Sequence, residues 1–263
     1  MTANLNSDLR RAILDLVYKG RDGHIPSAFS IVDLVDHLYG EVLRVDPRAP
    51  QWPGRDYFIL SKGHGCVALY AVLRKYGFLN DRDLEGFCRE GGLLGEHPDC
   101  RKVPGVEAST GSLGHGMPLA VGIALGLRIQ GADNRVVTLV GDGECQEGTI
   151  WESANIAANL RLGQLCAVVD WNGSAAQLMP LDDLPAKWAA FGWRVRVIDG
   201  HSHEEIRSAF ASWCPAPTAQ PQVIVARTVK GKGVPLLEGH GQWHHRIPSA
   251  EEYRAITEVL SRP

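Results

Sequence analysis

The sequence predicts an α/β fold in which helices cover both faces of a mostly parallel central sheet. Two β-branched runs, 136–140 and 165–170, are separated by a segment with helical periodicity, which predicts a strand–helix–strand unit. A crossover of that length makes the two strands parallel, so their carboxyl ends meet at one edge of the sheet. Further strands are expected at 57–60, 193–199 and 221–228, with a helix between the last two.

Periodicity and the positions of glycine and proline predict the remaining elements. Amphipathic helices are expected at about 5–19 and 30–43, and helical spacing resumes after Gly65. A loop-rich segment, 91–116, precedes a helix whose glycines and alanines permit another helix to approach closely. The proline-rich segment 214–221 is expected to be a surface loop rather than a domain linker. We therefore predict a single domain over residues 1–263.

Composition excludes several classes of function. A net charge of −3 argues against nucleic acid as the main partner. The most hydrophobic stretch, 117–127, is too short to span a bilayer, and the first residues lack the apolar core of a secretory signal. The 6 cysteines show no C-x-x-C spacing, so neither a zinc site nor a disulfide framework is expected. We expect a cytoplasmic protein that works without a membrane.

The most informative segment lies between Asp142 and Asn172. Each residue directly follows or closes a predicted strand, so both side chains are expected at the sheet edge where α/β proteins bind ligands. Carboxylate and amide oxygens suit Mg²⁺ or Ca²⁺, and substrate phosphates usually complete the coordination of Mg²⁺. Gly141 and Gly143 allow the backbone to approach a phosphate. Two ordinary turns are the alternative, but the strand–helix–strand spacing favours a metal–diphosphate site.

This pattern resembles the thiamine-diphosphate signature, and the QEG that follows GDG resembles the transketolase branch of those enzymes. Four other stretches agree with that family, and the resemblance covers about residues 8–255; the stretches are DGHIPS, LSKGHG, GEHPD with PGVEASTGSLGHG, and TVKGKGV with WHH. The resemblance implies the thiamine-diphosphate-binding fold and a diphosphate-binding half encoded as a separate chain. It also implies two cofactors, thiamine diphosphate and Mg²⁺, with Ca²⁺ or Mn²⁺ as substitutes.

The resemblance also implies roles for individual residues. His64 contacts the cofactor diphosphate, and His24 and His97 donate hydrogen bonds to substrate hydroxyls and to a developing oxyanion. His244 is a further histidine near the diphosphate, although its neighbour His245 remains an alternative. The other implied cofactor contacts are Ser112, Leu113, Gly114, His115, Gly141, Gly143, Glu144 and Asn172, and the implied metal ligands are Asp142, Asn172 and Ser174.

Two acidic residues after the metal motif have a simpler explanation, because carboxylates stabilise the first turn of a helix. The resemblance implies instead that Glu147 lies near the subunit interface and helps link two active sites, with Glu152 as a weaker candidate.

The segment 229–248 is expected to be an active-site loop that orders on cofactor binding, or else a plain surface loop. Its lysines, Lys230 and Lys232, lack the G-x-x-x-x-G-K-[ST] pattern of an ATP-binding loop. Three other histidines are expected at the surface: His37, His201 and His203.

By resemblance, the aminopyrimidine ring is activated by a glutamate in the pyrimidine-binding domain of a second chain. We therefore expect this chain to act only with a separate carboxy-terminal subunit, as two copies of each, and to transfer a two-carbon ketol unit from a ketose to an aldehyde. The sequences DGHIPSAF and GSAAQLMPLDD depart from the family pattern beside the expected substrate. A glycolyl transfer to a lipoyl group or carrier protein is therefore the second interpretation. A pyruvate-dehydrogenase-like component ranks third, and a non-catalytic regulatory or assembly subunit is the alternative from another class.

Overall fold

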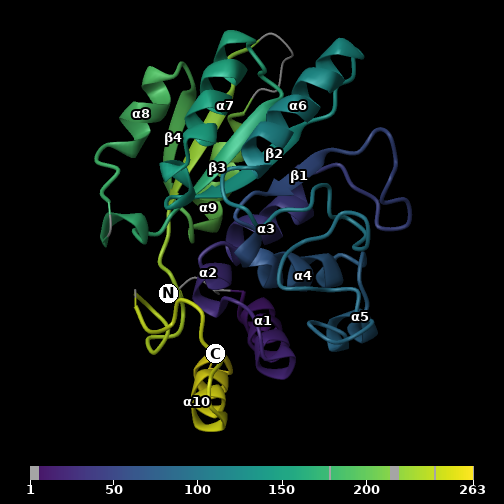
Figure 1. The fold of residues 1–263 in the computed structure, drawn as a ribbon, viewed down its shortest axis with the longest axis vertical. Helices are drawn as coiled ribbons and strands as arrows, with labels where there is room; N and C mark the ends of the chain where they lie inside the picture. The colour runs from purple at the N-terminus through teal and green to yellow at the C-terminus, as the bar shows by residue number, and fades with distance from the viewer. Residues whose placement is uncertain (1–5, 178, 214–218, 240, 263) are drawn as a thin grey trace.

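A single five-stranded sheet with the order β1-β2-β3-β5-β4 forms the centre of the molecule (Figure 1). All four strand pairings are parallel. The computed structural model describes residues 6–177, 179–213, 219–239 and 241–262. The strands are β1 (Tyr57–Leu60), β2 (Val136–Gly141), β3 (Leu165–Trp171), β4 (Arg194–Asp199) and β5 (Gln222–Arg227). The predicted α/β class with a parallel sheet is confirmed, and every predicted strand is present.

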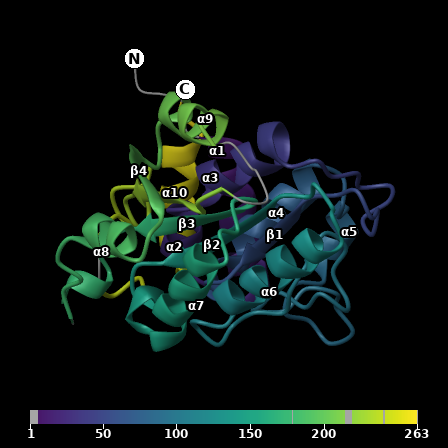
Figure 2. The same cartoon turned by 90° about the horizontal axis from the view of Figure 1, so that it is seen from above.

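Helices pack on both faces of the sheet (Figures 1 and 2). Helices α6 (Gly116–Ile129) and α7 (Gly148–Asn159) cover one face, and α3 (Val32–His37) and α9 (His203–Ala211) lie on the other. Successive strand residues point to opposite faces. In β2, Leu139 therefore belongs to the hydrophobic cluster under α3, whereas Val140 belongs to the cluster under α6 and α7.

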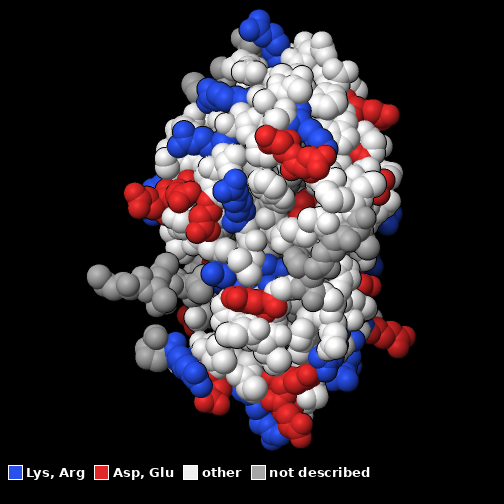
Figure 3. Space-filling model, turned by 90° about the vertical axis from the view of Figure 1, so that its left-hand side faces the viewer, with Lys and Arg blue, Asp and Glu red and all other residues white. Residues whose placement is uncertain are grey.

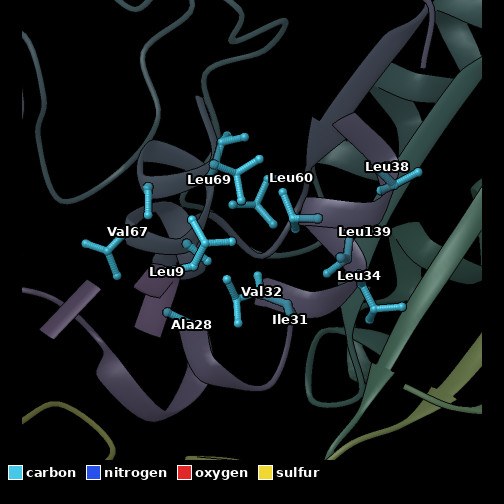
Figure 4. Packing of buried hydrophobic residues seen from close by; sticks show 14 of the residues in the cluster. Leu9, Ala28, Ile31, Val32, Leu34, Leu38, Leu60, Val67, Leu69 and Leu139 are labelled. Carbon is cyan, nitrogen blue, oxygen red and sulfur yellow. The ribbon is translucent and has the colours of Figure 1, made fainter. Parts of the chain in front are cut away.

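The larger cluster lies between the sheet and the amino-terminal helices (Figure 4). These are α1 (Ser7–Gly20), α2 (Ile25–Phe29), α3 and α4 (Cys66–Lys75). Leu34 and Val67 are completely buried in this cluster. Burial of a side chain of this size contributes about 1.5–3 kcal/mol relative to exposure. The cluster thereby fixes the loop before α2, which carries His24, against the carboxyl end of β1.

The helix predicted over 30–43 changes to a π-helical turn at its end, and a separate short helix, α2, precedes it. Residues 25–29 form α2, residues 32–37 form α3, and residues 38–42 continue as a π-helical turn. Ile31 has φ −112°, outside the helical range, and interrupts the path between α2 and α3. The helix expected from residue 5 begins at Ser7 in the described part of the chain, and of the loop expected at 214–221 only 219–221 are described.

Four α-helices of the described ranges were not predicted: α2, α5 (Asp81–Glu85), α8 (Leu184–Ala190) and α10 (Ala250–Leu260). The Asp183 side chain caps α8 by accepting from the backbone N–H of Ala186 at 3.0 Å. Ser249 and Glu252 form a capping box at the start of α10. Within the described ranges, no helix is long and apolar enough to cross a membrane.

Helix α10 returns the end of the described chain to its beginning by packing on α1 (Figure 1). The Tyr253 hydroxyl donates to Asp15 at 2.6 Å and accepts from Arg11 at 3.1 Å. The Tyr253 ring also stacks on Tyr18, with 4.1 Å between ring centroids. The segment between β5 and α10 is thereby attached at both ends, to the sheet and to α1. Near the start of this segment, the Gly231 backbone N–H donates to the Pro26 carbonyl at 3.0 Å.

Candidate active site

The carboxyl ends of four parallel strands bring polar residues to one edge of the sheet. Lys62 follows β1, Asp142 follows β2, Asn172 follows β3 and Lys230 follows β5. Lys62 and Asp142 are almost fully buried, with 1% and 2% relative exposure, and Lys230 is 5% exposed. Parallel strands and buried neighbours leave these side chains little freedom to move apart. The sheet therefore concentrates an acid, an amide and two ammonium groups in one region.

Asp142 and Asn172 are connected through a single turn. One carboxylate oxygen of Asp142 accepts from the backbone N–H of Gly143 and the other from that of Gly173, both at 2.7 Å. Gly173 has φ +81°, which an L side chain rarely adopts and glycine adopts freely. The Asn172 Oδ1 accepts from the Ser174 backbone N–H at 3.0 Å. Burial raises the pKa of Asp142, and the nearby Asp170 raises it further, as expected where a cation would be favoured.

A buried carboxylate, Asp170, accepts hydrogen bonds from several side chains of this region. It is 0% exposed and accepts from the Lys62 ammonium at 2.6 Å, the Ser30 hydroxyl at 2.8 Å and the Asn172 amide Nδ2 at 2.9 Å. The Thr228 hydroxyl also donates to it. Burial opposes ionisation, but Lys62 and the hydroxyl donors outweigh it and lower the pKa of Asp170. Because Asp170 binds the NH₂ of Asn172, the orientation of this amide is fixed, with its oxygen toward the backbone N–H of Ser174.

Glu144 performs a similar structural task on the neighbouring loops. Its carboxylate accepts from the backbone N–H of Gly114 at 2.9 Å and of Gly141 at 3.0 Å, and from the Ser61 hydroxyl. Burial raises the pKa of Glu144. The loop that precedes α6 and the turn after β2 are thereby joined to the end of β1. This positions Ser112, Leu113 and Gly114 beside the same edge of the sheet.

Four histidine rings form a cluster centred on His24, which precedes α2. The centroid of the His24 ring lies 5.3 Å from His64, 5.6 Å from His244 and 4.5 Å from His245. Burial, together with the neighbouring histidines, lowers the pKa of His24 to about 4, and burial, together with Lys62, lowers the pKa of His64 to about 2. Both imidazoles are therefore neutral near pH 7. The His24 Nδ1 is buried and has no hydrogen-bond partner.

The structure distinguishes the two adjacent histidines of the WHH motif. His244 Nδ1 lies 2.9 Å from the Lys230 Nζ, which also donates to the Ser174 hydroxyl at 3.4 Å. Burial and the neighbouring Lys230 lower the pKa of His244. His245 instead turns its Nε2 toward the Asp22 carboxylate at 3.0 Å. His244 thus faces the strand-end lysine, and His245 faces the loop before α2.

The other residues expected at the site differ in their burial. His97 is half-buried, and its backbone carbonyl accepts from the Tyr70 hydroxyl at 3.0 Å. Ser112 and His115 are exposed, and His115 directly precedes α6. Glu147 is also exposed and precedes α7, where its place is compatible with either a helix-end or an interface role.

Two of the histidines expected at the surface are buried, so that prediction is wrong for His37 and His201. Their exposures are 5% and 7%. His201 Nδ1 lies 2.9 Å from the Asp33 carboxylate, which also binds Arg10 at 2.7 Å. The His201 Nε2 accepts from the backbone N–H of Val229 at 2.9 Å and so supports the segment that carries Lys230. The five described cysteines are free: Cys66, Cys88, Cys100, Cys145 and Cys166.

Sequence reasoning missed Lys62 and Asp170, and it weighed Lys230 only against an ATP-binding loop. Both lysines lie in stretches that carry the family resemblance, LSKGHG and TVKGKGV. A lysine a few residues after an apolar strand is a usable signal, because such a residue lies near the ligand-binding edge of a parallel sheet. The next residue after Lys62 is also constrained: a Cβ at Gly63 would lie 2.8 Å from the backbone nitrogen of Gly111.

The fold and this strand-end site define the class of the protein as a diphosphate-binding α/β domain. Comparison with known proteins makes the assignment specific. Residues 2–261 match the family described as transketolase, thiamine diphosphate binding domain. The chain belongs to this family, and the predicted thiamine-diphosphate-dependent transferase class is confirmed.

Among similar proteins, one of the subunits of the apulose-4-phosphate transketolase of Phocaeicola vulgatus is 37% identical over 96% of this chain and 92% of its own length. The 6-deoxy-6-sulfo-D-fructose transketolase subunit SqwG of a Clostridium species is 39% identical over 97% of this chain and 94% of its own. The solved transketolase of Leishmania mexicana superposes with a TM-score of 0.92 at 28% identity. That match covers 100% of this chain and 42% of the solved chain.

Proposed function

We propose that this chain is the thiamine-diphosphate- and Mg²⁺-binding half of a two-subunit transketolase that transfers a ketol unit from a ketose to an aldehyde. Two relatives named as transketolase subunits match over nearly their whole length, which supports this reading. The solved transketolases are longer, and the chain spans about two fifths of them, at 42% and 40%. A second polypeptide with the pyrimidine-binding domain would supply the rest, and we place the complex in the cytoplasm.

The observation that carries the proposal is the direct connection between Asp142 and Asn172 through Gly173. Their carboxylate and amide oxygens form the hard donor set that Mg²⁺ requires, and Ser174 is adjacent for a third contact. Lys62 and Lys230 lie beside them and would neutralise the diphosphate. His64 adds a neutral imidazole donor at the same place. The donors present therefore fit both the metal and the diphosphate.

The bound thiamine diphosphate would supply an electron sink for the carbanion formed from the ketose. The tasks left to this chain are to bind the cofactor, to orient the substrate and to move protons. His24 and His97 would donate hydrogen bonds to substrate oxygens, and His24 is neutral at working pH because burial lowers its pKa to about 4. Neutral donors held by packing need no reorganisation when negative charge develops on oxygen.

One face of this chain carries charges of both signs. Figure 3 shows lysines and arginines interspersed with acidic residues on the face that carries α8 and β4. We place the recognition of an anionic sugar terminus mainly in the partner subunit. The two relatives are named for a phosphorylated and a sulfonated sugar, so the donor screen begins with apulose 4-phosphate and 6-deoxy-6-sulfo-D-fructose. Aldehydes and lipoyl or carrier-bound acyl acceptors are compared as acceptors.

The experiment is calorimetry of thiamine diphosphate binding with and without Mg²⁺, followed by turnover assays of the chain with its partner. Asp142→Ala should abolish the Mg²⁺-dependent part of binding and all turnover. Glu204→Gln, an exposed change on α9, is the matched control and should leave both unchanged. The metal assignment fails if the Asp142 variant remains active. Full turnover by the chain without any partner would refute the split-enzyme proposal, and binding without turnover on any donor would favour a regulatory subunit.

A further inference from the structure

A second group of potential metal ligands lies at the mouth of the site, separate from Asp142 and Asn172. One ligand atom each from His24, Glu96 and His245 lie within 4.8 Å of one another, in the only such group among the described histidine, cysteine and acidic residues. The Asp22 carboxylate is adjacent to this group of three, 3.0 Å from the His245 Nε2. The distance from that nitrogen to the Glu96 carboxylate is 3.8 Å.

The protein holds these residues in place before any ion binds. Three consecutive carbonyls around Glu96 are fixed from α4: Tyr70 donates to those of Gly95 and His97, and the Cys66 thiol donates to that of Glu96 at 2.8 Å. On the other side, the His245 ring stacks on the His24 ring at 27°. The His24 Nδ1 is buried and has no partner, so an electron pair or a proton at this atom is unused.

The chemistry of the group differs from that of the strand-end site. Two imidazole nitrogens and one or two carboxylates favour Zn²⁺, Ni²⁺ or Co²⁺, with a coordination position left for water or a substrate oxygen. Mg²⁺ prefers oxygen ligands alone. Both imidazoles must be neutral to coordinate, and His24 is neutral near pH 7. The carboxylates balance the charge of a divalent ion. The side chains of Asp22, Glu96 and His245 are 33%, 36% and 50% exposed, so an ion can enter from solvent.

We propose that His24, Glu96 and His245, assisted by Asp22, bind a divalent transition-metal ion at the mouth of the active site. An ion at this place engages His24, which the proposed function assigns to the substrate. Binding of the metal should therefore inhibit ketol transfer while thiamine diphosphate and Mg²⁺ remain bound. The inhibition rests on the proposed function, whereas metal binding itself does not.

The binding test uses the full chain in excess Mg²⁺, titrated with Co²⁺ and followed by its visible absorption, with Zn²⁺ used in competition. We expect one Co²⁺ per chain, displaced by Zn²⁺. His245→Ala and Glu96→Gln should each weaken binding at least tenfold. His203→Ala on α9 is the control and should bind like the parent chain. Circular dichroism melts identify any variant that fails to fold, and Glu96→Gln keeps the size of the side chain it replaces.

The proposal is overturned if no Co²⁺ spectrum appears in excess Mg²⁺, or if both ligand variants bind Co²⁺ as tightly as the parent chain. A second measurement uses the complex with its partner and records the ratio of turnover with and without Zn²⁺. The ratio should rise toward one in His245→Ala. An inactive complex that still binds Co²⁺ in the expected way would refute the proposed function and leave the metal site intact.

Discussion

The buried pair between Lys62 and Asp170 allows a quantitative test of how the site is held together. Asp170→Ala removes the carboxylate but leaves the Lys62 ammonium, which is 1% exposed, without its 2.6 Å partner. A buried charge that loses its partner destabilises a protein by about 3–5 kcal/mol. The hydroxyls of Ser30 and Thr228 also lose their acceptor, which places the expected loss toward the upper end of that range.

The assay is urea unfolding of the full chain at pH 7, with the free energy of unfolding extrapolated to water. The double variant Lys62→Met/Asp170→Leu removes both charges and should recover most of the stability lost in Asp170→Ala. Glu41→Gln breaks the solvent-exposed pair with Arg207 and is the control, with almost no effect expected. A loss below about 1 kcal/mol in Asp170→Ala would refute the argument, because Lys62 would then have found water or another partner.

Three further predictions follow from the same geometry. The free energy of unfolding should fall as the pH decreases from about 6.5 toward 4. The reason is that His24 takes up a proton below about pH 6.5 in the unfolded chain but only below about pH 4 in the folded protein. His24→Gln should flatten this part of the curve of unfolding free energy against pH. Gly63→Ala should lower the free energy of unfolding in urea by about 1–3 kcal/mol, because the added Cβ would meet the backbone of a loop. Gly122→Ala in α6, where nothing lies within 4 Å of the added Cβ, should raise the free energy of unfolding by up to about 1 kcal/mol. Equal effects of the two changes would refute the steric account. Lys230→Met should raise the dissociation constant for thiamine diphosphate about tenfold in calorimetry, corresponding to one charged hydrogen bond, and an unchanged constant would place Lys230 outside the site.

The sheet and the placement of Asp142 and Asn172 could be predicted because both depend on local patterns. β-Branched runs mark the strands, and residues that follow parallel strands must share one edge. The contacts beneath the site could not be predicted in this way. Asp170 lies inside a strand and meets Lys62, which is 108 residues distant in the chain. No periodicity in the sequence records such a contact.

The errors in the sequence analysis have a similar origin. His201 lies among glycine and serine, a composition typical of solvent-exposed turns, yet it is buried against Asp33, 168 residues away. The short helix α2 was not predicted, and the apolar pattern does not show the change in the backbone angle at Ile31 that separates it from α3. Local composition thus indicates whether a segment tends to form a helix, a strand or an exposed turn. Contacts with residues distant in the chain decide whether a polar side chain within it is buried or exposed to water.

The docking of α10 on α1 has a consequence for how the molecule responds to changes at its amino terminus. The segment after β5 carries Lys230 and His244, and its far end is attached through Tyr253 to α1. Shortening α1, or fusing a bulky tag that displaces it, would remove the attachment at the far end of this segment and raise the conformational entropy that cofactor binding must overcome. Affinity tags are therefore better placed elsewhere, and a loss of cofactor affinity on trimming the first helix would be a long-range effect of released tethering.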